Sequence, residues 1–242
     1  MEAETDLRPL RVLRVYSIPK RDDTRNEDRA CVSDDGSICA VSDGASISFD
    51  SGYWAEILAR RFVSNQDISK LWIDAAIQEY RSAYDRDAMS WAYQAAFDRG
   101  SFATLLGIVC ASDGRGVRVF ALGDTLLAFT DSGKVVRTLP YVQPDEFDQS
   151  PRLISTNPLE NNSVDEDTLS DSWRVLTVAS HDAPTLLLMT DAIGRWLLEQ
   201  PDSDRARQLL EIADAEAFAS FVDRERVEGR MKRDDSTLVV VG

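Results

Sequence analysis

Short stretches of the chain alternate between hydrophobic and polar residues, which is the pattern of strands with one buried face. LRVLRVYS (10–17) alternates in this way near the N-terminal end. The apolar runs ACVS (30–33) and SICAVS (37–42) follow, with Asp35 and Gly36 between them. Because Asp-Gly between two apolar runs is typical of a tight hairpin turn, we expect these runs to pair as a hairpin.

Elsewhere the apolar residues recur at intervals of three and four residues, the spacing of a helix with one buried face. Three such stretches predict helices, at 48–63, 68–97 and 192–230. We expect Asp50 or Ser51 to cap the first helix, since both side chains accept hydrogen bonds from the free N–H groups of a first turn. Pro201 is expected to divide the last helical stretch into pieces.

Further apolar runs bounded by turn residues predict strands. They are FATLLGIVCA (102–111), VRVFALGDTLLAFT (117–130), KVVRTL (134–139), WRVLTVA (173–179), TLLLMTD (185–191) and STLVVVG (236–242). Asp113 and Gly114 lie between the first two runs and predict a second hairpin turn. Strand runs separated by helix runs are typical of an α+β fold, here two antiparallel sheets with helices outside.

One long segment shows neither the alternation of a strand nor the spacing of a helix. Residues 140–172 are rich in Pro, Asn, Asp and Ser, so we predict a long surface loop. Long loops often carry function, and this one is a candidate flap over a binding site.

The charge of the chain is strongly negative. Its 27 basic residues against 42 acidic ones leave a net charge of −15, which disfavours nucleic acid and anionic lipid as partners. Such an excess usually serves solubility, but it can also reflect carboxylates gathered around metal ions. No apolar run is long enough to span a bilayer, and MEAETDLRPLRVLRVYS at the start lacks the apolar core of a signal peptide.

The three cysteines, Cys31, Cys39 and Cys110, lie in apolar strand-like runs. An odd number without close pairs argues against a disulfide framework. Buried reduced thiols are the simpler interpretation, and they indicate a cytoplasmic protein.

Several acidic residues lie at the ends of predicted core strands rather than in hairpin turns. They are Glu27, Asp28, Asp43, Asp191, Asp234 and Asp235. Each one alone is more often a turn or cap residue. Together, carboxylates brought to one cleft repel one another unless hard cations such as Mg²⁺ or Mn²⁺ neutralise them. Zinc is disfavoured, because the chain has one histidine, His181, and no Cys pair at ligand spacing.

The order of these motifs resembles that of the type 2C, metal-dependent protein serine/threonine phosphatases, in their small bacterial stand-alone form. The motifs are NEDR, AVSDG, FATLLGIV leading to ALGDT, LLLMTDAIG and DDSTLVVV. The resemblance covers about residues 10 to 242. It implies a single phosphatase-like domain over 1–242, with a flexible N-terminus at 1–9 and the α-β-β-α sandwich of that family.

The resemblance also implies a dinuclear Mn²⁺ or Mg²⁺ centre whose bridging hydroxide attacks phosphorus in phosphoserine and phosphothreonine. Asp43 would bridge the metals, and the carbonyl of Gly44 would bind one of them. Asp191 and Asp234 would complete the second metal. Glu27 and Asp28 would bind directly or through water, Asp235 would support the start of its strand or the residues around the metal ligands, and Asp124 matches a ligand of a third, weaker metal.

The chain departs from the family pattern in four places. Asp23 stands where many members have an arginine that binds the substrate phosphate, so Arg21, Arg25 or Lys20 is the candidate replacement or a solvated loop charge. The glycine-rich DGxGG sequence of the family is here DGASIS. Ala45 replaces a histidine that follows the bridging aspartate. Arg195 replaces an aspartate of the third metal site, which weakens the case for that metal.

Three functions therefore remain open. The first is a metal-dependent phosphatase acting on a phosphorylated protein, with a cognate Ser/Thr kinase and a monomeric state. The second is a pseudophosphatase that binds a partner protein, which the missing arginine favours. The third is a phosphatase for a small molecule or an anti-sigma-type regulator, which shares the chemistry. The complete carboxylate set favours an enzyme over a pseudophosphatase.

Overall fold

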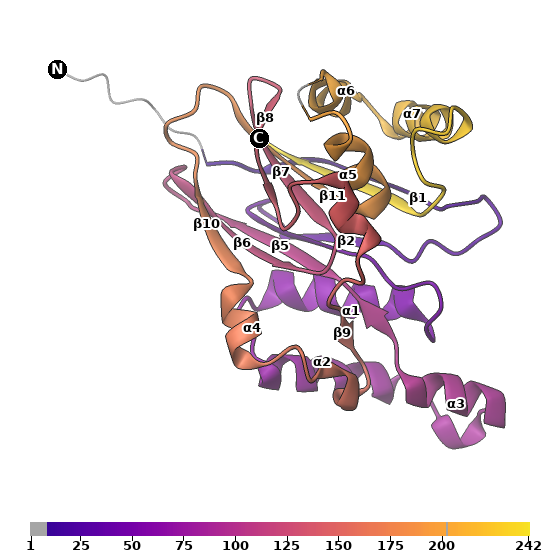
Figure 1. The fold of residues 1–242 in the computed structure, drawn as a ribbon. Helices are drawn as coiled ribbons and strands as arrows, with labels where there is room; N and C mark the ends of the chain where they lie inside the picture. The colour runs from indigo at the N-terminus through magenta and orange to yellow at the C-terminus, as the bar shows by residue number, and fades with distance from the viewer. Residues whose placement is uncertain (1–8, 202) are drawn as a thin grey trace.

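The computed structural model describes residues 9–201 and 203–242, and its strands form two stacked antiparallel sheets (Figure 1). The first sheet has the order β1 (Val12–Ile18), β12 (Ser236–Val241), β11 (Pro184–Met189), β7 (Leu126–Asp131), β8 (Lys134–Leu139). The second has the order β10 (Trp173–Thr177), β6 (Gly116–Leu122), β5 (Leu105–Cys110), β3 (Ile38–Ser42), β2 (Arg29–Val32). A short third sheet pairs β4 (Phe102–Ala103) with β9 (Ile154–Ser155).

Helices cover the two outer faces of the sandwich (Figure 1). The second sheet is covered by α1 (Ser51–Ser64), against which α2 (Lys70–Ser82) packs. The first sheet is covered by α5 (Asp191–Leu198), α6 (Arg205–Glu211) and α7 (Ala215–Val227). The expected α+β sandwich flanked by helices is confirmed.

Strand alternation decides which side chains enter which core layer. In β5, Leu106 and Ile108 point between the two sheets, whereas Leu105 points toward α1. In β11, Leu186 and Leu188 lie between the sheets. Because successive side chains of a strand point to opposite faces, strands buried on both faces need apolar residues at every position, as these runs have.

Two of the predicted hairpins are present as expected. β2 pairs with β3 and β5 with β6, and the turn glycines Gly36 and Gly114 have φ of 71° and 69°. Positive φ is a conformation that glycine adopts without steric cost. The dipeptides Asp35-Gly36 and Asp113-Gly114 are therefore turns.

The helix predicted over 68–97 is wrong in its extent, because it is interrupted. The chain forms α2, a short 3₁₀ turn η1 (Arg86–Ala88) and α3 (Trp91–Arg99). The Asp85 side chain accepts from the Ala88 N–H, and the Ser90 side chain accepts from the Tyr93 N–H. These side chains compete with the backbone and start new helical segments, which periodicity alone does not show.

The prediction that the side chain of Asp50 or Ser51 caps α1 is also wrong. Asp50 occupies the N-cap position but makes no capping hydrogen bond, and its φ is 40°. Its carboxylate instead accepts from the Tyr84 hydroxyl at 2.6 Å and pairs with Arg25. The Ser51 hydroxyl donates to Glu27 at 2.7 Å. Both side chains therefore form hydrogen bonds and ion pairs with other parts of the fold instead of capping α1.

The segment 140–172 differs from the long loop expected, because it contains short elements. They are η2 (Pro144–Asp148), β9, η3 (Pro158–Asn161) and α4 (Glu166–Asp171). Ile154, Val164 and Leu169 are buried in the core beneath α1 and α2. This burial was hidden by the polar composition of the segment.

Other expectations concern the ends and the cysteines. Of the expected flexible N-terminus at 1–9, residues 1–8 lie outside the described residues. Cys31, Cys39 and Cys110 are free thiols; Cys39 and Cys110 are buried, as predicted, whereas Cys31 is only half-buried. Across the described ranges, no helix is long and apolar enough to cross a membrane.

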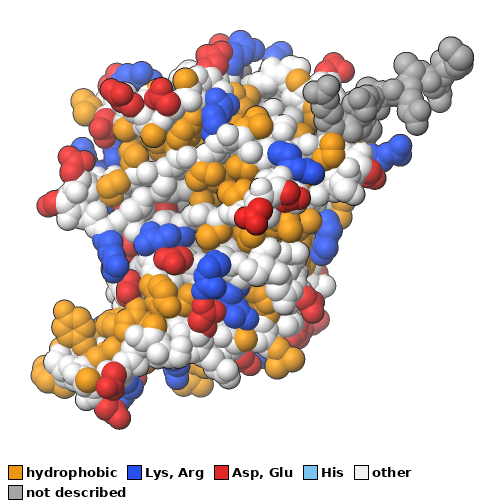
Figure 2. All heavy atoms as spheres, turned by 180° about the vertical axis from the view of Figure 1, so that it is seen from behind, with side chains coloured by type: hydrophobic (Ala, Val, Ile, Leu, Met, Phe, Trp, Pro, Cys, Tyr) orange, Lys and Arg blue, Asp and Glu red, His pale blue; other side chains and the backbone are white. Residues whose placement is uncertain are grey.

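α3 projects from the edge of the fold, away from both sheets (Figure 1). Figure 2 shows the molecule from behind, where the same lobe lies at the lower left and hydrophobic side chains gather on it. Trp91 and Tyr93 of α3 are 81% and 63% exposed.

Candidate functional site

Strand ends from both sheets meet around one small acidic cavity. Its volume is about 310 Å³, and its walls include Asp43, Gly44, Asp124, Asp191 and Asp234. Asp43 follows β3, Asp124 lies between β6 and β7, Asp191 follows β11 and Asp234 precedes β12. The fold therefore brings together four of the carboxylates that the sequence singled out.

Asp43 and Gly44 lie directly after β3, on the segment that leads to α1. The Asp43 N–H donates to Thr104 Oγ1 at 2.8 Å, and the Thr104 N–H donates to the Asp43 carbonyl at 2.9 Å. A Cβ on Gly44 would lie 2.7 Å from the Ser51 carbonyl oxygen. Unlike the two turn glycines, Gly44 has an ordinary φ. It is glycine because the first turn of α1 passes so closely, and not because a hairpin needs it.

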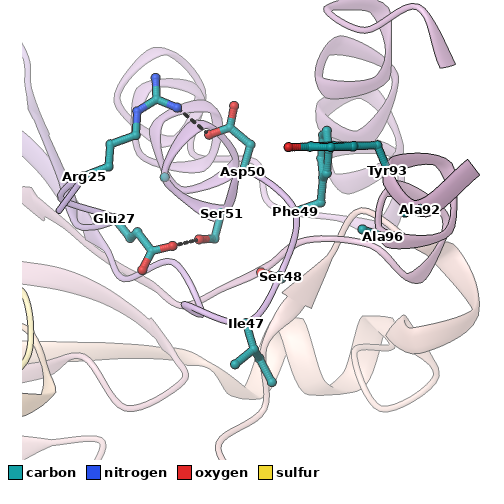
Figure 3. A pocket seen from close by; sticks show the side chains of 11 residues that line it. Arg25, Glu27, Ile47, Ser48, Phe49, Asp50, Ser51, Ala92, Tyr93 and Ala96 are labelled. Atoms are coloured by element: carbon teal, nitrogen blue, oxygen red, sulfur yellow. Dashed lines mark hydrogen bonds and ion pairs between the residues drawn. The ribbon is translucent and has the colours of Figure 1, made fainter. Parts of the chain in front are cut away.

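Glu27 lies on the β1–β2 loop and faces the start of α1. The Ser51 hydroxyl donates to Glu27 Oε1 at 2.7 Å (Figure 3), and Lys20 Nζ donates to Oε2 at 2.9 Å. Lys20 Nζ also donates to Ser46 Oγ at 2.7 Å, and Ser46 lines the acidic cavity. Burial by itself raises the pKa of Glu27, but its hydrogen bonds outweigh burial and lower it.

Asp28 is the most deeply buried acid of the set, at 2% exposure. Thr190 Oγ1 donates to its Oδ2 at 2.9 Å, whereas its Oδ1 has no hydrogen-bond partner among the described residues. Burial raises the pKa of Asp28 well above its ordinary value. A buried, unpaired carboxylate oxygen is costly in free energy, and such groups in native proteins commonly serve a site.

Asp191 and Asp234 share one cation. Lys232 Nζ lies 2.9 Å from Asp191 Oδ2 and 2.7 Å from Asp234 Oδ2. Burial lowers the pKa of Lys232, but the charges of Asp191 and Asp234 outweigh burial and raise it. The second oxygen of Asp191 is buried and has no hydrogen-bond partner within the part of the chain that the structure describes.

The electrostatics of the cavity favour a further positive charge. Burial raises the pKa of Asp43, and the neighbouring charges of Asp28 and Asp191 raise it further. Burial also raises the pKa of Asp191, and it raises the pKa of Asp124 to about 6. Each shift means that the charged form is disfavoured here, and a bound cation would reverse that preference.

Asp235 supports the loop that carries Glu27. Its carboxylate accepts from the Lys20 N–H at 2.6 Å and from the Glu27 N–H at 2.7 Å. Arg226 of α7 contacts the same region. Its guanidinium donates to the carbonyls of Pro19 and Asp234. Together these contacts tie β12, α7 and the β1–β2 loop into one unit.

The predicted phosphate-binding arginines line two other hollows. Arg25 faces Asp50 (Figure 3), and its side chain is 79% exposed. Arg21 lines a hollow against α7 together with Lys20 and Arg233. Neither Arg25 nor Arg21 lines the acidic cavity. Their role stays a prediction, and Lys20, the third candidate, is the one that contacts the carboxylates.

The donor set suits a hard divalent cation. All the side chains offer oxygen, and Asp28 and Asp191 each hold a buried oxygen without a partner in the described structure. Over residues 9–201 and 203–242, however, no three acidic, His or Cys side chains converge closely enough to form a ready metal site. The ligand assignments therefore stay predictions.

Comparison with known proteins identifies the family. The sequence profile described as Protein phosphatase 2C matches residues 15–228. The chain belongs to the protein phosphatase 2C family. The expected family and enzyme class, protein serine/threonine phosphatase, are confirmed. No curated protein matches the sequence significantly.

Several solved structures share the fold. The catalytic domain of the serine/threonine protein phosphatase PstP in complex with two manganese ions is 17% identical, with a TM-score of 0.60 and coverage of 96% of this chain and 97% of that one. PstP/Ppp of Mycobacterium tuberculosis is 17% identical, with a TM-score of 0.57 and coverage of 96% and 98%. PppA, a regulatory component of T6SS in Pseudomonas aeruginosa, is 17% identical, with a TM-score of 0.54 and coverage of 96% of both chains.

Two cationic residues of this phosphatase-family site were missed by sequence reasoning. Lys232 and Arg226 both contact the segment around Asp234. Lys232 lies only two positions before Asp234, so the short spacing was a usable signal. Arg226 lay in a helical stretch full of charges, and nothing in that pattern distinguished it from a solvated side chain.

Proposed function

We propose that this protein hydrolyses phosphoserine and phosphothreonine in proteins, with two Mn²⁺ or Mg²⁺ ions held by the acidic cavity. The observation that carries the proposal is the convergence of Asp43, Asp124, Asp191 and Asp234 on one cavity in a chain of this family. The manganese-bound PstP relative has the same fold. Bound ions would supply a nucleophile from water at neutral pH and neutralise charge on the phosphoryl oxygens.

The residues of the chain divide the remaining work. Asp43, next to the Gly44 carbonyl, would hold both ions, while Asp191 and Asp234 would hold one. Glu27 and Asp28 would bind the ions directly or through water, with Asp124 as a ligand of a weaker third ion. Lys20, which contacts Glu27 and Ser46, is the cation best placed to meet a substrate phosphate.

The proposal also covers the substrate, the oligomeric state and the cellular location of the enzyme. We take its substrate to be a phosphorylated protein with a cognate Ser/Thr kinase, and the enzyme to be a monomeric domain in the cytoplasm. Three free thiols accord with a reducing compartment.

Turnover with and without metal tests the proposal. An aryl phosphate and a phosphothreonine peptide are assayed with Mn²⁺, Mg²⁺ or EDTA, using wild type, Asp43→Asn and Asp113→Asn. Asp113 is the matched control, because it is the first residue of a turn Asp-Gly pair far from the cavity. We expect metal-dependent turnover that falls by on the order of 10²-fold or more in Asp43→Asn and is kept in Asp113→Asn. Full activity of Asp43→Asn would overturn the site assignment.

A second function is favoured by the positions of the cationic side chains. The cation on Asp191 and Asp234 is Lys232, and Arg21 and Arg25 lie outside the cavity, a combination that suits a pseudophosphatase binding a partner protein. Mn²⁺ binding without turnover of any phosphopeptide would select this function over the enzyme.

A further inference from the structure

Large apolar side chains are exposed beside the acidic cavity rather than buried. Ile47, four residues after Asp43, is 98% exposed, and Tyr93 on α3 is 63% exposed. Between them lies a hollow of about 570 Å³ lined by Arg25, Glu27, Ile47, Phe49, Tyr93 and Ala96 (Figure 3), which we call the α3 groove. Exposed apolar side chains gathered around a hollow commonly mark a binding surface.

A middle hollow links the α3 groove to the acidic cavity. This hollow of about 590 Å³ shares Ile47, Ser48 and Ala96 with the α3 groove. The same middle hollow shares Ala45 and Leu153 with the acidic cavity. The three hollows therefore adjoin one another along the surface, from the aspartates past the loop after β3 to α3, and we call this series of hollows the channel.

The wall of this channel is held in place by hydrogen bonds and aromatic packing. Tyr80 Oη donates to the Phe49 carbonyl at 2.6 Å, and the Ser48 hydroxyl donates to the Ala45 carbonyl at 2.7 Å. The Phe49 ring packs edge-on against Phe97 at 5.5 Å and Tyr93 at 6.4 Å between ring centroids. A preformed apolar wall binds its ligand without the entropic cost of ordering a loop.

The lining charges of the channel are mostly paired, and the net charge of the whole chain disfavours a strongly acidic ligand. Arg25 at the rim of the α3 groove is paired with Asp50, and Asp98 of the middle hollow is paired with Arg86. Glu27 is paired with Lys20, Glu160 lines the middle hollow together with Arg99, and the whole chain carries −15. A neutral or basic segment with a large apolar side chain fits this surface.

We propose that the channel binds the polypeptide of the substrate on one side of its phosphorylated residue, with a leucine-sized side chain seated in the α3 groove between Ile47, Phe49 and Tyr93. The inference rests on the proposed phosphatase function. An extended peptide is the occupant that uses the whole channel, because its phosphate can reach the aspartates while a residue farther along the chain reaches α3. The channel thereby selects substrates by an apolar residue near the phosphate.

A leucine scan of a phosphopeptide tests this inference. A neutral phosphothreonine peptide with alanine flanks is compared with ten relatives, each with one leucine at one of five positions on either side. With Mn²⁺, we expect one leucine position to raise kcat/KM about tenfold, the gain from burying much of a leucine side chain. Ile47→Ser and Tyr93→Ser should each bring the leucine-to-alanine ratio close to one. A ratio is insensitive to a general loss of active protein.

The matched control is Trp91→Ser. Trp91 lies on the same helix and is 81% exposed, but it lines neither the α3 groove nor the middle hollow. We expect this variant to keep the leucine preference. The inference would be overturned if no leucine position raised kcat/KM in wild type. It would also be overturned if both Ile47→Ser and Tyr93→Ser kept the wild-type leucine-to-alanine ratio. A dimer in sedimentation that Ile47→Ser dissociates would overturn it too, because a second copy would then occupy the groove.

Failure of the phosphatase function gives a different result. If wild type hydrolyses neither the aryl phosphate nor any peptide with Mn²⁺, the proposed function fails. Binding of the labelled peptides in EDTA, followed by fluorescence anisotropy, then decides the inference. The leucine peptide should bind about tenfold more tightly than the alanine peptide to wild type and equally to Tyr93→Ser. Equal affinities for wild type would reject the groove.

Discussion

At the residue scale, Lys232 is the side chain that most alters the expected site. Its ammonium group lies within 3 Å of oxygens of both Asp191 and Asp234, at 2.9 and 2.7 Å. In the proposed function these two carboxylates bind a divalent ion. An ion entering there must displace Lys232 Nζ from both oxygens, so the lysine competes with the metal.

Lys232→Gln is therefore expected to bind Mn²⁺ about tenfold more tightly than wild type, because glutamine cannot offer the competing charge. Isothermal titration calorimetry measures the change directly. Arg233→Gln is the matched control, since it removes the same charge from the exposed neighbouring position and has no ion pair with these aspartates. Weaker Mn²⁺ binding in Lys232→Gln than in Arg233→Gln would contradict the competition.

Asp124 makes the stability of the metal-free protein depend on pH. Burial raises its pKa from 3.8 to about 6, so the native state holds a proton that the unfolded state has already released between these values. Stability therefore falls as pH rises toward and through about 6. In EDTA we expect wild type to be more stable at pH 5 than at pH 7.5.

Asp124→Asn should remove much of this dependence and stabilise the protein at pH 7.5 by on the order of 2 kcal/mol. Urea unfolding at several pH values gives the profile, with the exposed turn variant Asp113→Asn expected to follow wild type. If Asp124→Asn kept the full slope of wild type, other carboxyls would have to account for it.

At the element scale, the contact of α1 with the second sheet depends on one small residue. Gly107 in the middle of β5 faces Phe62 of α1, and a Cβ there would lie 2.3 Å from the Phe62 ring. Gly107 thus lets the helix lie close enough to bury Trp54, Leu58 and Phe62 completely. The site depends on this contact, since α1 begins beside Gly44 and carries Ser51.

Gly107→Ala is expected to destabilise the protein by about 2 kcal/mol, the usual cost of overpacking a filled core. Chemical denaturation measures the change. Gly116→Ala at the start of β6 is the milder control, because its Cβ would meet one atom, the Leu176 carbonyl oxygen, at 3.2 Å. Equal losses in the two variants would show that the Phe62 contact is not the cause.

The elements also show where sequence patterns succeed. The runs around β5, β11 and β12 were predicted as strands because nearly every position is apolar, and a strand between a sheet and a helix layer needs this. The helix at 68–97 was predicted too long, since Asp85 and Ser90 start new segments with hydrogen bonds that hydrophobic spacing does not report. Polar composition likewise concealed the buried Ile154 within 140–172.

At the scale of the whole molecule, the acidic cavity links metal binding to folding. Its carboxylates come from both sheets, so only the folded chain brings them together. A ligand that binds only the native state stabilises it, by about 2.7 kcal/mol at a concentration one hundred times its Kd. Millimolar Mn²⁺ should therefore raise the Tm above that in EDTA by about 5–10 °C for a chain of this size.

Differential scanning calorimetry tests this expectation. Asp43→Asn should show a smaller rise with Mn²⁺ than wild type, while Asp113→Asn, in its turn far from the cavity, should show the full rise. A Tm of wild type that is the same in Mn²⁺ and in EDTA would count against a metal centre in this cavity.

The sequence by itself determined the layers of the fold and the family, because strand and helix periodicities and the order of short acidic motifs are local properties of the chain. It also singled out the carboxylates at strand ends. Only the tertiary structure decided which side chains neutralise them. Lys232 forms ion pairs with Asp191 and Asp234, Lys20 with Glu27, and Arg25 with Asp50. Long cationic side chains have many rotamers, and the packing around each one selects its partner.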